Sequence, residues 1–266
     1  MIHFHLDFYP FSLFSHQSTP FVTTLHGRVD SPHLKPVFST FAEMSFVAIS
    51  NAQRNDLPAA NWAGTVHHGL PEDLHIPQPV ERTYLAFLGR ITPVKKVDVA
   101  IRIAQQCGIP IKIAAKIDDA DRAYFERDIG PLFDSPLVDY VGEISEYEKT
   151  AFLSGALALL FPIDWPEPFG LVMIEAMACG TPVIAFPFGS VPEVIEEGVT
   201  GFIVSDEAQA VAAVHKVGQL SAQQIREQFE KRFTARHMAQ KYVCAYETLI
   251  ARPAIHNDDS DQCSGL

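Results

Sequence analysis

Short apolar runs alternate with longer stretches of mixed polarity along almost the whole chain. A short apolar run bounded by turn residues is typical of a buried parallel strand, and the longer stretch that follows is typical of a crossover helix. The alternation is most regular in the second part, where we predict strands at Tyr84–Leu88, Ile111–Ala115, Val138–Val141, Leu157–Phe161, Pro182–Phe186 and Phe202–Val204. The pattern therefore predicts an α/β fold built on parallel sheet.

Helices are predicted between these strands from capping residues and closing glycines. The SEYE sequence at Ser145 is a capping box, and SVPE at Ser190 predicts a second capped helix start. Gly108 and Gly180 close two of the helices. We expect helices at Val97–Cys107, Asp119–Asp128, Ser145–Ala156 and Leu171–Cys179, followed by three more, the last near Thr234–Ile250.

The first part of the chain is less regular but has the same character. We predict strands at Met1–His5, Phe21–Leu25 and Phe46–Ser50 and a helix near Leu34–Ala42. The polar, proline-rich segment from Gly69 to Pro79 reads as an interdomain linker. We expect a partial N-terminal domain at 1–78, a second domain at 79–233, a helix at 234–250 that packs back on the first domain, and a disordered tail at 251–266.

Composition narrows the class of partner. The chain has 266 residues, 47% of them hydrophobic, and a formal net charge of -12 without a basic block. Nucleic acid is therefore not expected as a partner, and an anionic ligand has to be held by a few placed cations and backbone N–H groups. The four cysteines are scattered, which fits a reducing cytosol. No signal peptide or transmembrane run is apparent, so we expect a cytoplasmic protein.

Several common catalytic motifs are absent, among them GxGxxG, the P-loop, GxSxG and HExxH. The two DxD triplets, Asp119–Asp121 and Asp259–Asp261, open a predicted helix and lie in the tail, where acidic residues need no ligand. His3 and His5 form an HxH pair without a further ligand cluster, so a structural role is favoured. We therefore predict no metal site and no cofactor.

The most informative stretch runs from Phe161 to Ala185, where a buried strand is followed by a short loop and a helix. The loop carries Glu167, and the helix begins at about Gly170. Ligands of open parallel sheets bind at the carboxyl ends of strands, next to helix N-termini. The unpaired N–H groups of Gly170, Leu171 and Val172 are therefore expected to bind an anion.

Three charged residues near this stretch are candidate ligand contacts. Glu175 has apolar neighbours at helical spacing, so its carboxylate needs hydrogen-bond donors, such as ligand hydroxyls. The alternative is that Glu175 faces solvent or pairs with a basic residue. Arg90 and Lys95 follow the strand that ends at Leu88 and suit a diphosphate, although a solvated basic loop would have the same composition.

Residues 82–250 resemble the C-terminal domain of the family 4 glycosyltransferases. The resemblance rests on GR at 89–90 with Lys95, VGEI at 141–144, EPFGLVMIEAMACGTPVIA at 167–185 and GSVPEVIEEGVTGFIV at 189–204. Glu167 and Glu175 have the spacing of that family's E-x7-E signature. Four earlier segments, HFHLDF, TPFVTTLHGRVD, VAISNAQR and VHHGL, resemble the second half of its N-terminal domain, with His67 or His68 in place of the usual Asn.

The resemblance implies two facing Rossmann-like domains, the GT-B arrangement, and transfer of a hexose from a nucleoside-diphosphate sugar to an acceptor hydroxyl with retention and without a metal. It implies that Arg90 and Lys95 grip the diphosphate and that Glu175 holds the ribose hydroxyls. Catalytic roles would fall to Glu167, which positions the sugar, and to His26, which lies near the reacting sugar and acceptor. Backbone contacts would come from Phe169, Gly170 and Leu171 to the sugar and from Gly142 to Ile144 to the nucleobase.

The chain begins inside the first domain of that family, so we expect its N-terminal domain to be incomplete. The remaining strands would then leave an open edge and uncovered apolar faces, which favour self-association, mobility or early proteolysis. Two alternatives to an active transferase remain. One is a non-catalytic nucleotide-sugar-binding fragment without a complete acceptor domain, and the other is a hydrolysing or epimerising relative.

Overall fold

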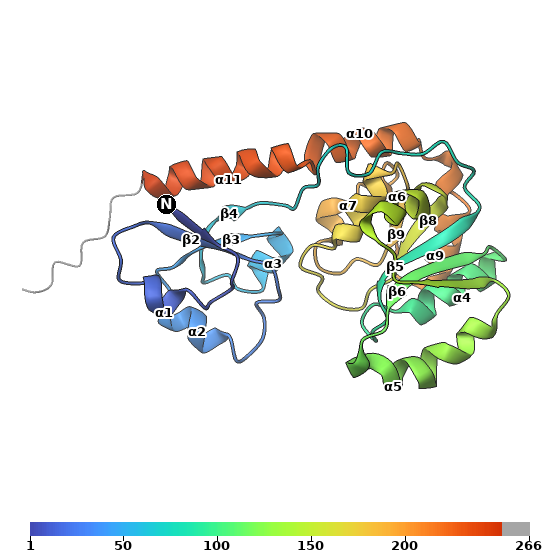
Figure 1. Cartoon of the computed structure of the whole chain (residues 1–266), viewed down its shortest axis with the longest axis horizontal. Helices are drawn as coiled ribbons and strands as arrows, with labels where there is room; N and C mark the ends of the chain where they lie inside the picture. Colours follow the sequence, from blue (N-terminus) through green and yellow to red (C-terminus); the bar gives the residue numbers. More distant parts are fainter. Residues whose placement is uncertain (252–266) are drawn as a thin grey trace, which may run out of the picture.

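The computed structural model describes residues 1–251 and divides them between two parallel sheets (Figure 1). The smaller sheet has the order β1 (Ile2–Phe4), β2 (Phe21–Leu25), β3 (Ser45–Ala48), β4 (Asn61–Thr65). All its strand pairs are parallel. Three short helices accompany it, α1 (Phe11–Phe14), α2 (Lys35–Thr40) and α3 (Asn51–Asn55). The α/β class with parallel sheets is confirmed.

Strand β4 was not predicted from the sequence. Its residues, NWAGT, contain one large apolar side chain and none of the run of β-branched residues that marks a buried strand. The strand is only half-buried, and its pairing with β3 shifts register between Phe46 and Val47. The edge position and the irregular pairing explain why the apolar signal is weak.

The larger sheet has six strands in the order β10-β9-β8-β5-β6-β7, and every pairing is parallel. Its strands are β5 (Tyr84–Arg90), β6 (Ile111–Lys116), β7 (Val138–Gly142), β8 (Ala156–Phe161), β9 (Val183–Ala185) and β10 (Gly201–Ile203). Counted along the chain, this is the doubly wound order 3-2-1-4-5-6. The strand order therefore reverses between β5 and β8, the topological position at which doubly wound sheets bind ligands in a crevice outside the carboxyl ends of the strands.

The principal helices of this part are α4 (Val97–Cys107), α6 (Glu146–Ser154), α7 (Leu171–Ala178), α9 (Glu207–Val214), α10 (Ala222–Arg232) and α11 (Ala235–Ile250). The capping box predicted at Ser145 is present. Within residues 1–251, no helix is both long and apolar enough to cross a bilayer.

The segment predicted as a helix at Asp119–Asp128 is helical, but it is not a regular α-helix. The segment is a 3₁₀ turn at Asp119–Asp121, a short α5 (Arg122–Tyr124) and a π-helical turn at Phe125–Ile129. Adjacent aromatic side chains of Tyr124 and Phe125 both pack against the core, and the hydrogen-bond register changes at this point. The tail triplet Asp259–Asp261 and the predicted disordered tail from 252 onward lie outside the described residues.

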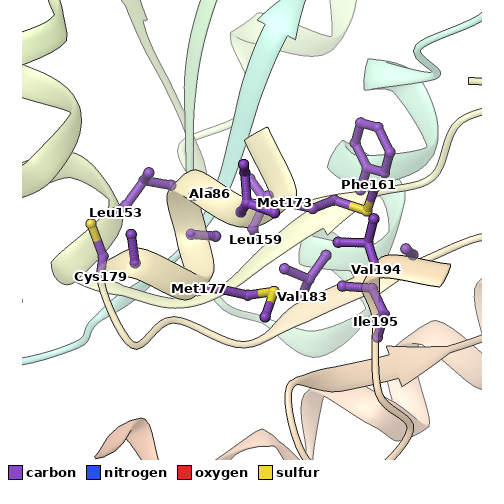
Figure 2. Packing of buried hydrophobic residues seen from close by; sticks show 14 of the residues in the cluster. Ala86, Leu153, Leu159, Phe161, Met173, Met177, Cys179, Val183, Val194 and Ile195 are labelled. Atoms are coloured by element: carbon purple, nitrogen blue, oxygen red, sulfur yellow. The ribbon is translucent and has the colours of Figure 1, made fainter. Parts of the chain in front are cut away.

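Helix α7 is apolar on almost every side because it is enclosed by the sheet, by α8 (Val191–Val194) and by α10. Figure 2 shows Met173 and Met177 of this helix lying against Leu159, Val183 and Val194. Burial on this scale fixes the axis of α7, and with it the direction of the N–H groups at its first turn.

Helix α11 crosses back over the smaller sheet (Figure 1). Tyr242 and Leu249 of this helix form an apolar cluster with Val22 and Val47 of the sheet. His3 lies beneath the helix, with Nδ1 2.7 Å from the Tyr246 hydroxyl and Nε2 2.7 Å from Thr24 Oγ1. The first histidine of the HxH pair thus has a structural role.

The linker joins the larger domain at the point where α10 gives way to α11. Leu70 N–H donates to the Phe233 carbonyl at 2.9 Å, and Ala235 N–H donates to the Leu70 carbonyl at 2.7 Å. The backbones approach so closely that a Cβ on Gly69 would overlap the Thr234 carbonyl. Position 69 requires glycine because no side chain fits there, and not because of its backbone dihedral angles.

We predict that Gly69→Ala lowers the free energy of unfolding by about 1–3 kcal/mol, because the added methyl group pushes the linker away from α11. Urea denaturation of the full chain measures the effect. Gly64→Ala is the matched control, since a Cβ there has no heavy atom within 4 Å. Equal stability of the two variants would contradict the role assigned to this contact.

Candidate functional site

The candidate site lies where the strand order of the larger sheet reverses. Strand β5 ends at Arg90, and β8 ends at Phe161, on the two sides of this reversal. The carboxyl ends of both strands open on the same edge, and the N-terminus of α7 points to it from the β8 side. An open parallel sheet binds its ligands at this topological position. Of the sequence-predicted residues, Arg90 ends β5, and Lys95, Glu167 and Gly170 follow these two strands.

The loop between β8 and α7 is fixed from behind by Gly189 and Ser190. Ser190 Oγ donates to the Phe169 carbonyl at 2.6 Å, and Ser190 N–H donates to the Glu167 carbonyl at 3.0 Å. Gly189 has φ +57°, and a Cβ there would overlap the Glu167 backbone. The prediction that Ser190 caps the next helix is wrong: its hydroxyl holds this loop instead, and α8 has no side-chain cap.

The first turn of α7 opens with Gly170 at φ +76°, a left-handed conformation that favours glycine. Its Phe169 neighbour is buried, whereas Leu171 is 44% exposed. The N–H groups of Leu171 and Val172 have no intrahelical acceptors at this position. They supply partial positive charge to a ligand at the helix N-terminus.

Lys95, Glu167 and Trp165 form one contact network in this loop. Lys95 Nζ is ion-paired with Glu167, and Trp165 Nε1 donates to the same carboxylate oxygen at 2.9 Å. The Lys95 ammonium also lies 5.1 Å from the centre of the Trp165 ring. A cation and a carboxylate thus lie together at the helix N-terminus, and both side chains are mostly shielded from solvent.

Arg90 lies apart from this network. Its guanidinium is 62% exposed and 3.6 Å from Asp118, at the end of the neighbouring strand β6. It borders the same sheet edge as Lys95 but has no contact with Glu167 in this conformation. The side chain is therefore free to rotate toward an anionic ligand without losing a strong interaction.

Glu175 is 7% exposed, and it pairs with a basic residue, which is one of the alternatives weighed from the sequence. Lys149 Nζ on α6 lies 2.8 Å from Glu175 Oε1 and 2.8 Å from Glu146 Oε2. The ion pair supplies the donor that a buried carboxylate requires. Gly142, with φ +76°, ends β7, and Ile144 packs against the core close to α6.

His26 follows β2 in the smaller domain. It lies in a row of aromatic rings that ends at Phe169, in the loop between β8 and α7. Its Nε2 is 2.8 Å from His5 Nδ1, and its ring lies parallel to that of His68, at 5.3 Å and 7°. His68 in turn meets the edge of the Phe169 ring at 5.0 Å. The histidine predicted from the resemblance is therefore brought to the interface between the two domains.

Burial, together with the neighbouring His26 and His5, lowers the pKa of His68 from 6.5 to about 4. Burial and His5 also lower the pKa of His26. Both imidazoles are therefore neutral at pH 7. A cation at this position would oppose positive charge on a ligand, whereas neutral rings offer hydrogen bonds and apolar surface.

A small pocket opens between the two domains beside the Glu167 loop. Its walls are contributed by Arg28, Ala52, Gln53 and Asp56 on one side and by Pro166, Glu167, Pro168 and Gly189 on the other. Arg28 also lies over the Trp165 ring, at 5.9 Å from its centre. The loop that carries Glu167 therefore lies against the smaller domain at this pocket.

The sequence did not reveal which residues join the domains. Glu193 on α8 accepts from the N–H groups of Asn51 and Ala52 at 2.8 and 2.6 Å and lies 3.0 Å from His67 Nε2. Although burial opposes it, these hydrogen bonds hold the pKa of Glu193 below its usual value. The free N–H groups at the start of α3 were a signal for such a partner, but its identity depends on the tertiary fold.

Comparison with known proteins shows which protein family the chain matches. Residues 75–236 match the model of the family described as "Glycosyl transferases group 1". The chain is 33% identical over 145 residues to proteins named D-inositol 3-phosphate glycosyltransferase from Mycobacterium bovis and Mycobacterium tuberculosis. That match covers 53% of this chain and 28% of each relative, so the chain spans only part of their length.

Two solved structures show the same fold. Sucrose-phosphate synthase from Thermosynechococcus elongatus superposes with a TM-score of 0.81 at 20% identity, covering 94% of this chain and 74% of that chain. HepE of Anabaena, solved with UDP and glucose, superposes with a TM-score of 0.72 at 19% identity, covering 86% of this chain and 72% of that chain.

The lowered pKa of His68 predicts a pH dependence of stability. Below pH 6.5 the unfolded chain takes up a proton that the folded chain excludes, so stability falls as the pH drops from 6.5 toward 4. We predict that His68→Asn, which removes this group, loses less stability than the wild type between pH 7 and pH 4.5. Urea denaturation at both pH values measures the difference, and identical losses would show that His68 titrates normally.

Proposed function

Because the chain belongs to the group 1 glycosyltransferases, we propose that it transfers a hexosyl group, with retention, from a nucleoside-diphosphate sugar to an acceptor hydroxyl. The observation that supports this most directly is the pairing of Lys95 with Glu167 at the N-terminus of α7. A cation, a sugar-binding carboxylate and free N–H groups converge there, at the topological position where doubly wound sheets bind nucleotides.

In the proposed complex the diphosphate lies between the end of β5 and the start of α7. Lys95 turns from Glu167 to the diphosphate, and Arg90 turns from Asp118 to the same group. Glu167 is then released to accept hydrogen bonds from hydroxyls of the transferred sugar. Because negative charge grows on the diphosphate as the glycosidic bond breaks, the fixed cations and the helix N-terminus stabilise the transition state more than the ground state.

The nucleoside half of the donor is proposed to extend from α7 toward α6. Glu175 accepts from the ribose hydroxyls, and Lys149 retains Glu146 as its second carboxylate partner. The backbone from Gly142 to Ile144 faces the nucleobase at the end of β7. The base would therefore be read just before the start of α6 and the transferred sugar at the start of α7.

The acceptor is proposed to enter between the domains, beside the His26 and His68 rings. Neutral His26 can hydrogen-bond a hydroxyl of the transferred sugar without repelling the positive charge that develops at its anomeric carbon. In a front-face displacement, the acceptor oxygen attacks from the side of the leaving diphosphate, and a diphosphate oxygen takes the acceptor proton. This course retains configuration and requires neither a covalent carboxylate intermediate nor a metal-bound step.

An assay with radiolabelled nucleoside-diphosphate sugars and a panel of hydroxyl acceptors tests the proposal. The proposed function predicts a labelled acceptor product, formed equally well in EDTA. Release of free labelled sugar would indicate a hydrolase, and saturable binding without product would indicate a binding module. A product of inverted anomeric configuration would contradict the front-face course.

We predict that Arg90→Ala combined with Lys95→Ala weakens nucleoside-diphosphate binding at least tenfold and leaves the fold intact, because each charged hydrogen bond contributes about 1.5–3 kcal/mol. Calorimetric titration measures the affinity. Arg236→Ala with Lys241→Ala removes the same formal charge from α11 and serves as the control. Equal affinities of the two double variants would contradict the proposed position of the diphosphate.

A further inference from the structure

A cluster of side chains with atoms that could bind a metal ion lies next to the candidate site and shares Glu175 with it. Among the described residues, one group of three His, Cys, Asp or Glu side chains offers ligand atoms all within 4.8 Å of one another: His75, Glu146 and Glu175. His75 belongs to the interdomain linker, Glu146 to α6 and Glu175 to α7. Three separate segments of the chain thus meet at one point.

The imidazole of His75 is fully buried, and its Nε2 is directed into this cluster. Nδ1 lies 3.0 Å from Thr150 Oγ1. Nε2 lies 2.9 Å from Glu146 Oε1, yet within residues 1–251 it has no partner with hydrogen-bond geometry. Burial of a polar atom without a hydrogen bond is costly, and a cation that binds both Nε2 and the carboxylate would remove that cost.

We propose that His75, Glu146 and Glu175 form a binding site for a divalent cation of the zinc class, which would displace the Lys149 ammonium from between the two carboxylates. One imidazole nitrogen and two carboxylates form a donor set suited to Zn²⁺ or Co²⁺. Lys149 lies 2.8 Å from each carboxylate and marks the centre of the negative field. The two carboxylates carry a charge of -2, so a dication that displaces the Lys149 ammonium neutralises the cluster.

His75 is held in position before a cation binds, whereas the Lys149 side chain can move. A hydrogen bond from Nδ1–H to Thr150 leaves the Nε2 lone pair for the cation, as in most histidine-ligated metal sites. Arg226 fixes the linker backbone by donating to the His75 carbonyl at 2.6 Å and to the Glu72 carbonyl at 2.6 Å. Lys149, with a side chain that is 20% exposed, can turn out to solvent.

The cation would couple two parts of the molecule. It would tie the linker, through His75, to both helices that flank the proposed nucleoside site. It would also occupy Glu175, and this consequence rests on the proposed function, in which Glu175 binds the ribose. Divalent cation and nucleotide are therefore expected to compete, so the cation would inhibit transfer.

Titration of the full-length chain with Co²⁺ followed by visible absorption, and with Zn²⁺ followed by calorimetry, tests the site. We expect one equivalent of either ion to bind, and His75→Asn to weaken that binding at least tenfold. His33→Asn, at an exposed histidine, is the matched control and should leave binding unchanged. No saturable binding by the wild type, or equal loss in both variants, would overturn the proposal.

Two further variants keep the test decisive if His75→Asn fails to fold. Glu146→Gln, at an exposed position, should weaken cation binding and keep UDP affinity within about twofold, while Glu175→Gln should weaken cation binding and also change UDP binding. Lys149→Met should tighten cation binding. Tight cation binding by Lys149→Met alone would overturn the site in the natural chain. Cation binding that leaves UDP affinity unchanged would keep the metal site but contradict the ribose role of Glu175.

Discussion

The geometry of the candidate site depends on the contact between the Gly189–Ser190 backbone and the loop that carries Glu167. Gly189 lets the two backbones meet, and Ser190 binds the carbonyls of Glu167 and Phe169. The contact fixes the backbone of the loop that leads into α7, while Lys95 and Trp165 hold the Glu167 carboxylate. A few residues further on, Glu193 binds the start of α3 and His67. The segment from Gly189 to Glu193 therefore holds the loop between β8 and α7 and joins it to the smaller domain.

In the proposed function, this acidic chain keeps its cations paired with carboxylates until the anionic ligand binds. Arg90 has Asp118, Lys95 has Glu167 and Lys96 has Asp164 as a carboxylate partner. Of these pairs, only Lys95–Glu167 is mostly shielded from solvent, and there the pairing avoids an uncompensated buried charge. In the proposed complex, an incoming diphosphate replaces the carboxylates, and the freed Glu167 becomes available to sugar hydroxyls.

The sequence was sufficient for the centre of the larger sheet because strands β5, β6, β8 and β9 are largely buried and read as apolar runs. It was insufficient where an element is half-exposed, as in β4, or where the hydrogen-bond register changes, as after Tyr124. The spacing of Glu167 and Glu175 located the candidate site, but the partners Lys95 and Lys149 lie on other elements. Such long-range pairings, and the role of Ser190 as a loop clamp, follow from the tertiary fold alone.

The central claim is that the crevice between β5 and β8 binds a nucleoside diphosphate through cations and helix N–H groups, without a metal. Isothermal titration of the wild-type chain with UDP, GDP and ADP in excess EDTA tests it most directly. The account predicts saturable binding of one equivalent of at least one of these nucleotides. Absence of binding heat for all three in EDTA, with binding restored by added Mn²⁺, would contradict it.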